Sequence, residues 1–159
     1  MLLPLHAQVT GIGSAKTWVF LNFEQNYGIY IADASVNLNL NTPEDFMEGT
    51  ATDFLSSHLK VVSRGGYEVW VKAASEDFYV EGTPTGIPVN AIKINTRNSV
   101  GTASVSLSSV SQLLIGSNKK KFSESLDVNY EISSDRTDYF FNQSGKVYET
   151  VIIYTLILN

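Results

Sequence analysis

The most reactive side chains of this sequence are its two histidines, because the chain contains no cysteine that could act as a nucleophile, bind metal or form a disulfide. His6 lies near the start, and His58 follows Ser56 and Ser57. A Ser-His-acid hydrolase needs a positioned serine, and the sequence has no Gly-x-Ser-x-Gly elbow that would present one. We therefore expect His58 to be a surface or edge histidine, and we do not expect an enzyme.

A loose acidic cluster is the one candidate for a metal site. It consists of Glu44, Asp45, Glu48 and Asp53. Carboxylate oxygens are the ligands that Ca²⁺ prefers, but the spacing does not match an EF-hand loop, and the histidines lack ligand spacing. A solvated acidic loop is the favoured interpretation, so we expect neither a metal nor another cofactor.

Trp70 is the candidate for ligand contact. It falls on the polar side of an alternating segment, beside Glu68 and Lys72. An exposed aromatic ring there would present a flat apolar surface to a sugar ring, as in a carbohydrate-binding module. The alternative is a tryptophan packed beneath a loop.

Charge and hydropathy exclude two classes of partner. The formal net charge is −5, and the single basic run, Lys119–Lys121, is expected to be a solvated turn. Nucleic acid is therefore not an expected partner, because phosphate binding needs clustered basic residues. No apolar run approaches the ~18 residues of a membrane span.

The elements that would position these residues are strands. Segments 36–41, 67–73 and 126–132 alternate apolar and polar residues with the period of a half-buried strand. We expect an all-β protein, specifically an antiparallel β-sandwich of about eight to ten strands with an immunoglobulin-like topology, and a closed barrel as the alternative. Residues 17–23 and 28–32 suggest a hairpin, 82–86 a loop, and 46–55 the one short helical turn. The predicted core comprises Val36, Leu38, Leu40, Val69, Val71, Ile92, Ile94, Leu126, Val128, Tyr130 and Ile132.

The N-terminus suggests export. Residues 1–8 are apolar and end with a small residue before Gln8, which is typical of the end of a secretory signal. We expect residues 1–8 to be a signal-peptide remnant, residues 9–159 to form a single sandwich domain, and the protein to be extracellular.

The C-terminal run, residues 147–158, is apolar on both of its alternating faces. One face would join the core, and the other needs a cover, which is either a loop or tail of the same chain or another subunit. Assembly by strand addition is one hypothesis, with residues 8–15 or the C-terminal run itself as the donor. The N-terminal segment is favoured, because Gly11 and Gly13 would let it swing, and residues 1–15 would then contact another subunit. The candidate contact residues for assembly are Gln8, Val9, Ile12, Val151, Ile153 and Ile157.

The succession of strand-like segments carries a resemblance. These segments are His58–Ser63, Tyr67–Ala73, Ile87–Ile94, Val105–Ser108, Leu126–Ile132 and Tyr148–Leu156. Over residues 36–157 the chain resembles small secreted β-sandwich proteins of Bacteroidota and, more distantly, bacterial surface and pilus-subunit domains. The resemblance implies a cell-surface structural or adhesive protein, such as a filament subunit, whose partners are further copies or other surface proteins. A carbohydrate-binding module with glycan partners is the alternative, and a hydrolase has no motif in its favour.

Overall fold

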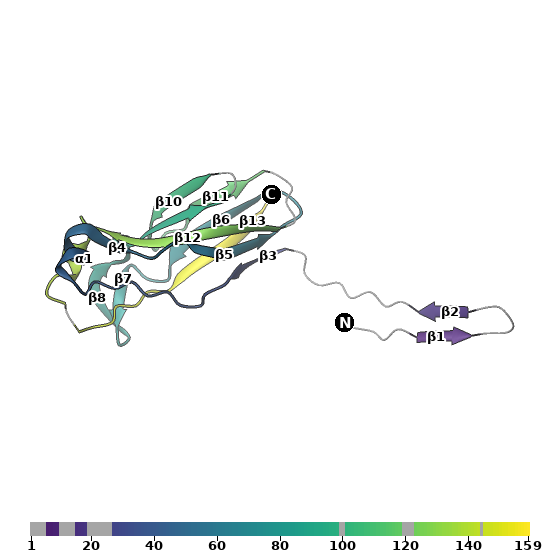
Figure 1. Ribbon diagram of the computed structural model, residues 1–159, viewed down its shortest axis with the longest axis horizontal. Helices are drawn as coiled ribbons and strands as arrows, with labels where there is room; N and C mark the ends of the chain where they lie inside the picture. The colour runs from purple at the N-terminus through teal and green to yellow at the C-terminus, as the bar shows by residue number, and fades with distance from the viewer. Residues whose placement is uncertain (1–5, 10–14, 19–26, 99–100, 119–122, 144) are drawn as a thin grey trace.

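The structure is a computed structural model that describes residues 6–9, 15–18, 27–98, 101–118, 123–143 and 145–159. It is built almost entirely of antiparallel strands, which form two main sheets packed face to face (Figure 1). These sheets confirm the prediction of an all-β sandwich. No helix in the described ranges is long and apolar enough to cross a membrane.

The first sheet is six-stranded and has the order β10-β9-β12-β5-β3, with β4 pairing with β12 beyond the end of β5. The long strand β12 lies at its centre, and all of its pairings are antiparallel. The bounds of these strands are β3 Gly28–Ile31, β4 Gly49–Ala51, β5 Leu55–Val62, β9 Lys93–Arg97, β10 Thr102–Ser106 and β12 Ser123–Ser133.

The second sheet is three-stranded and has the order β11-β6-β13, with bounds β11 Gln112–Ser117, β6 Tyr67–Ala73 and β13 Ile152–Leu158. The turn between β5 and β6 carries the chain from one sheet to the other. In the constant-type immunoglobulin fold, the first strand of the three-stranded sheet in chain order lies at the edge of that sheet. The corresponding strand here is β6, and it lies in the middle, between β11 and β13. The immunoglobulin-like topology is therefore not confirmed.

Smaller elements lie around the sandwich. Strands β7 and β8 form a hairpin at the end that also carries α1, whereas β1 and β2 pair with each other beyond the opposite end (Figure 1). The bounds are β1 His6–Val9, β2 Ala15–Trp18, α1 Pro43–Glu48, β7 Asp77–Val80, β8 Thr83–Pro88, and the 3₁₀ turns η1 Val89–Ala91 and η2 Thr137–Phe140.

The core between the sheets contains the predicted residues. Both sheets contribute to one cluster of buried side chains. Alternate residues of β6 enter it from one sheet, and alternate residues of β12 enter it from the other. Val36, Leu38 and Leu40 are half-buried and pack against this cluster. The other predicted core residues are fully buried, namely Val69, Val71, Ile92, Ile94, Leu126, Val128, Tyr130 and Ile132.

Several local predictions are wrong in instructive ways. Residues 36–41 alternate in burial but are not a strand, because no described strand pairs with their backbone. Residues 19–26 of the predicted hairpin of 17–23 with 28–32 lie outside the described residues, and in the described parts β2 pairs with β1 and β3 pairs with β5. The predicted loop at 82–86 is largely strand β8, and the C-terminal strand begins only at Ile152.

The short helix begins earlier than predicted because of its cap. The Thr42 hydroxyl accepts the Asp45 N–H, while the Asp45 carboxylate accepts the Thr42 N–H at 2.8 Å, which forms a capping box. The helix ends at Gly49, which has a φ of +87°. A Cβ there would lie 2.5 Å from the Ile132 carbonyl oxygen, so only glycine allows β4 to approach β12.

Candidate functional site

His58 lies inside the protein rather than at its surface, so the sequence-based prediction for this residue is wrong. The pairing of β5 with β12 is irregular between Leu126 and Val128. Within this irregularity Ser57 has a φ of +52°, and its N–H donates to the Asp127 carboxylate at 2.9 Å. The bulge turns His58 into the interior, where it is 1% exposed. Plain alternation along β5 does not predict such a turn.

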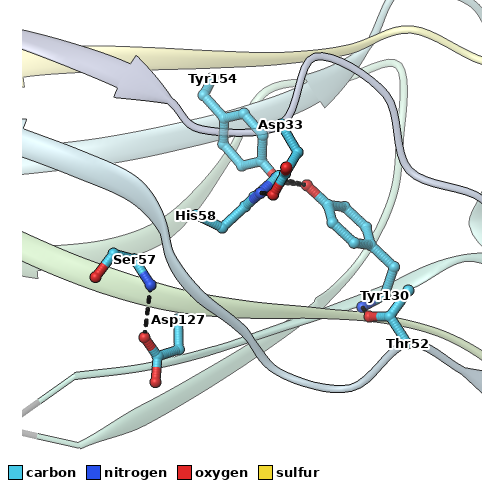
Figure 2. Close-up of polar contacts among 7 residues, drawn as sticks. All are labelled: Asp33, Thr52, Ser57, His58, Asp127, Tyr130 and Tyr154. Atoms are coloured by element: carbon cyan, nitrogen blue, oxygen red, sulfur yellow. Dashed lines mark hydrogen bonds and ion pairs between the residues drawn. The ribbon is translucent and has the colours of Figure 1, made fainter.

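A continuous line of hydrogen bonds passes through His58 (Figure 2). Its Nδ1 lies 3.2 Å from Asp33 Oδ2, and its Nε2 lies 3.0 Å from the Tyr130 hydroxyl, which lies 2.7 Å from the Tyr154 hydroxyl. An ionised carboxylate only accepts, so Nδ1 donates to Asp33, and in the neutral imidazole Nε2 then accepts from Tyr130. The Tyr130 oxygen then accepts the proton of Tyr154. Both ring nitrogens of His58 and both tyrosine hydroxyls therefore have partners.

This line of residues joins both sheets. His58 and Tyr130 belong to the first sheet, Tyr154 belongs to β13 in the second, and Asp33 follows β3. Burial raises the pKa of Tyr154 and also that of Tyr130, so both phenols stay protonated at neutral pH. The histidine ring faces a buried phenol rather than a nucleophile in a cleft. The arrangement suits a structural cross-link between the sheets better than catalysis.

A second buried polar pair links the sheets near the other end of β6. The Tyr67 hydroxyl donates to the Glu124 carboxylate, which also accepts from Asn98 Nδ2 at 2.9 Å. Burial, together with the adjacent Glu124, raises the pKa of Tyr67. This pair was not predicted, although the sequence contains a signal for it. Glu124 has the same strand parity as the inward-facing Leu126 and Val128, which places a carboxylate in the core.

The four acidic residues considered for calcium do not come together. The Asp45 carboxylate is occupied by the helix cap, where it accepts the backbone N–H groups of Asn41 and Thr42, and these bonds lower its pKa. Within the described ranges no three His, Cys, Asp or Glu side chains converge as a metal site would require. Glu44, Glu48 and Asp53 therefore gain no support as ligands.

Trp70 lies on the outer face of the second sheet, at its centre. Its neighbours across the two ladders are Leu113 of β11 and Thr155 of β13. The ring is half-buried, and its Nε1 donates to Glu68 Oε2 at 2.8 Å. Leu113, which the sequence did not single out, is 46% exposed beside it.

Three of the residues considered for assembly form an outward row on β13 and the residue before it. Val151 is 63% exposed, Ile153 38% and Ile157 43%, whereas the alternate residues Ile152, Tyr154 and Leu156 pack against the core. Among the described strands β13 pairs only with β6, so its other edge is open. Gln8 and Val9 pair with Lys16 and Ala15 in the β1–β2 hairpin. Ile12 lies outside the described residues.

The expected boundary between residues 8 and 9 falls inside β1, which runs from His6 to Val9.

The comparisons with known proteins do not add a family. The sequence matches no family model, and it matches neither a curated protein nor a solved structure. The resemblance to secreted proteins of Bacteroidota stays a prediction, and the function must be argued from the site alone.

Proposed function

We propose that this chain is a secreted structural or adhesive protein that assembles with further copies through the β13 side of its sandwich. The observation that carries the proposal is the outward apolar row of Val151, Ile153 and Ile157 beside an open strand edge. Exposed apolar edge strands promote pairing with other chains, and soluble proteins usually protect them with charge or proline. β13 has neither.

The neighbouring edge has the same character. β3 is the last strand of the first sheet, it contacts β13, and its Tyr30 and Ile31 are exposed. The two sheets therefore end side by side in apolar edge strands. An extended segment added here would hydrogen-bond to one edge and place alternate side chains on both, as in strand addition.

The N-terminal hairpin is the candidate donor. Its two strands pair with each other in regular register, and Figure 1 shows them beyond the end of the sandwich that carries the C-terminus. The donor would therefore be a two-stranded ribbon rather than the single strand expected from the sequence. The two strands of such a ribbon are already hydrogen-bonded to each other, and the ribbon would pair with the acceptor strand through one outer edge.

The test is the oligomeric state of the protein over a range of concentrations, measured by size-exclusion chromatography with light scattering. We expect concentration-dependent growth that Val151→Lys or Ile157→Lys abolishes. Val110→Lys is the matched control, because Val110 is 70% exposed in the connection between β10 and β11, away from β13. A wild-type protein that stays monomeric at all concentrations would refute the proposal.

A carbohydrate-binding module is the second candidate, and the position of Trp70 favours it. The ring lies on a broad strand face beside exposed Leu113, with Glu68 and Lys72 available for sugar hydroxyls. Binding to a glycan array that Trp70→Ala removes, by a protein that is monomeric, would support this function over assembly.

A further inference from the structure

The outer face of the second sheet has a symmetric pattern of side chains, and the inference drawn from it rests on the proposed self-assembly. Along β6 this face presents Glu68, Trp70 and Lys72, with Trp70 in the middle. Along β13 it presents Ile157, Thr155 and Ile153, each opposite one of these residues. The centre is thus Trp70 beside Thr155, and each end combines one charge with one isoleucine.

A half-turn about an axis through this centre, in the plane of the face and perpendicular to the strands, exchanges the two ends. It carries the position of Glu68 onto that of Lys72, and the position of Ile157 onto that of Ile153. Two copies related by this axis would place each Glu68 opposite Lys72 of the other copy and isoleucine opposite isoleucine. The surface is complementary to itself, which is the requirement for an isologous contact.

We infer that a second copy of this chain covers the outer face of the β11-β6-β13 sheet, as a two-fold, face-to-face dimer. Sheets that pack in this way lie about 10 Å apart with interdigitated side chains. The contact would remove Leu113, Ile153 and Ile157 from water, residues that are now 38–46% exposed. Trp70 would form its centre, where aromatic residues dominate most interfaces.

Charge selects this axis among the alternatives. An axis parallel to the strands would place Glu68 against Glu68 and Lys72 against Lys72, and like charges brought together are destabilising. In the perpendicular arrangement the Glu68 carboxylate keeps its bond from Trp70 Nε1 and gains the second copy's ammonium. Lys72, which is engaged in no ion pair with another described residue, gains a carboxylate.

The first experiment uses charge reversal in the full-length protein. Lys72→Glu places carboxylates opposite each other, and Glu68→Lys does the same with ammonium groups, so each variant alone should dimerise at least tenfold more weakly. An equimolar mixture of the two should form a heterodimer, because every opposed pair is then of opposite sign. The doubly reversed variant, Glu68→Lys with Lys72→Glu, should dimerise like the wild type.

Circular dichroism and thermal unfolding of each variant guard against a folding defect, since Glu68→Lys also removes the bond to Trp70. Rescue in the mixture is itself evidence that both variants are folded. Added salt should weaken the repulsion in each single variant, because exposed charges are screened.

The second experiment places a thiol on the axis. The chain has no cysteine, so Thr155→Cys creates its only thiol. Thr155 is exposed beside Trp70, and a short bismaleimide should cross-link two copies of this variant. Ser125→Cys is the matched control, because Ser125 is exposed on β12 in the opposite sheet, where we expect no cross-linking.

The outcomes separate the two proposals. If the wild type associates but the mixed charge variants do not rescue one another, the two-fold arrangement is wrong and assembly through β13 stands. If the wild type is monomeric throughout, both are wrong. If Trp70 is protected by a polysaccharide while the protein stays monomeric, the face is a glycan surface and the dimer is refuted.

Discussion

The two outer faces of the sandwich differ in their side chains: the first sheet presents a hydrogen-bonded polar network, and the second presents exposed apolar groups. On the first sheet, Asn95 Nδ2 donates to Asn129 and to Glu131, at 2.8 and 2.9 Å, and Asn95 Oδ1 accepts from the Ser104 hydroxyl. Next to this group, Arg97 pairs with Asp127 at 3.1 Å and lies over the Phe54 ring. The second sheet instead presents Trp70 and a set of aliphatic side chains.

The two faces therefore differ in the groups that they present to solvent: hydrogen-bonded polar side chains on the first sheet, and exposed apolar side chains on the second. The first face meets its bonding requirements within the chain and is compatible with water as it stands. On the second face Trp70 donates to Glu68, and burying the exposed apolar groups beside this pair would be favourable. Both faces lie over the same packed core, so the contrast between them is one of surface chemistry and not of a weakly folded sheet.

The largest effect should come from the core that both faces share. Leu126 is fully buried on the inner side of β12, and Leu126→Ala should lower the free energy of unfolding by about 2–5 kcal/mol. Chemical denaturation measures this value. If the loss were near zero, the two sheets would not share one packed core and the contrast between their outer sides would lose its meaning.

A smaller loss in the free energy of unfolding should follow when a hydrogen bond of the polar face is removed. The Asn129 amide donates to the Thr52 carbonyl and accepts from Asn95. Asn129 is buried, and Asn129→Ala leaves the Thr52 carbonyl without its side-chain donor, whereas Asn95 keeps its bond to Glu131. The substitution should cost about 1–3 kcal/mol of stability. Ser125→Ala, at an exposed position of the same strand, is the control and should leave the denaturation midpoint unchanged.

The apolar face should behave in the opposite way. Ile157→Thr keeps a β-branched strand residue and removes little buried area, so the unfolding free energy of the dilute protein should change by less than about 0.5 kcal/mol. Its self-association, followed by light scattering, should fall sharply. A variant that is clearly destabilised but still assembles would place Ile157 in the fold rather than in the contact.

The smallest effect concerns acid. The backbone N–H of Ser57, and then Arg97, hold the pKa of Asp127 below its ordinary value. A carboxyl with a lowered folded-state pKa contributes stability above its unfolded pKa of about 3.9, and this contribution is lost as the pH falls through the folded-state value. Asp127→Asn should therefore flatten the decline in melting temperature below about pH 4. An unchanged slope would contradict the role of Asp127.

The sequence predicted the sandwich and its core because both depend on strand periodicity. In β6 every residue from Tyr67 to Ala73 has the burial that alternation predicts. The same rule placed Val36, Leu38 and Leu40 toward the core but could not tell that their backbone lacks a partner, since pairing depends on distant segments. Likewise, the bulge at Ser57 has no local signature, so the position of His58 and its line of hydrogen bonds could not be foreseen.

The candidate site was predicted in part. The doubly apolar pattern of residues 147–158 correctly marked a strand whose second face lies outside the core, and Trp70 emerged from its polar neighbours. Two features could not be predicted, namely which face of β13 is exposed and that Leu113 lies across from Trp70. Both depend on the register of three strands that are far apart in the chain.

The start of β3 and the end of β13 lie close to one turn, and their positions have a mechanical consequence. β3 begins with Gly28 opposite Val62, β13 ends with Leu158 opposite Tyr67, and Val62 and Tyr67 flank the same turn (Figure 1). A force that separates Gly28 from Leu158 therefore acts on the first rung of each ladder alone. The edge strands would peel away one pair at a time at low force. A pull between Gly28 and Leu55, at the opposite end of β5, would instead load the rungs of β3 and β5 together, in shear, and would meet much more resistance.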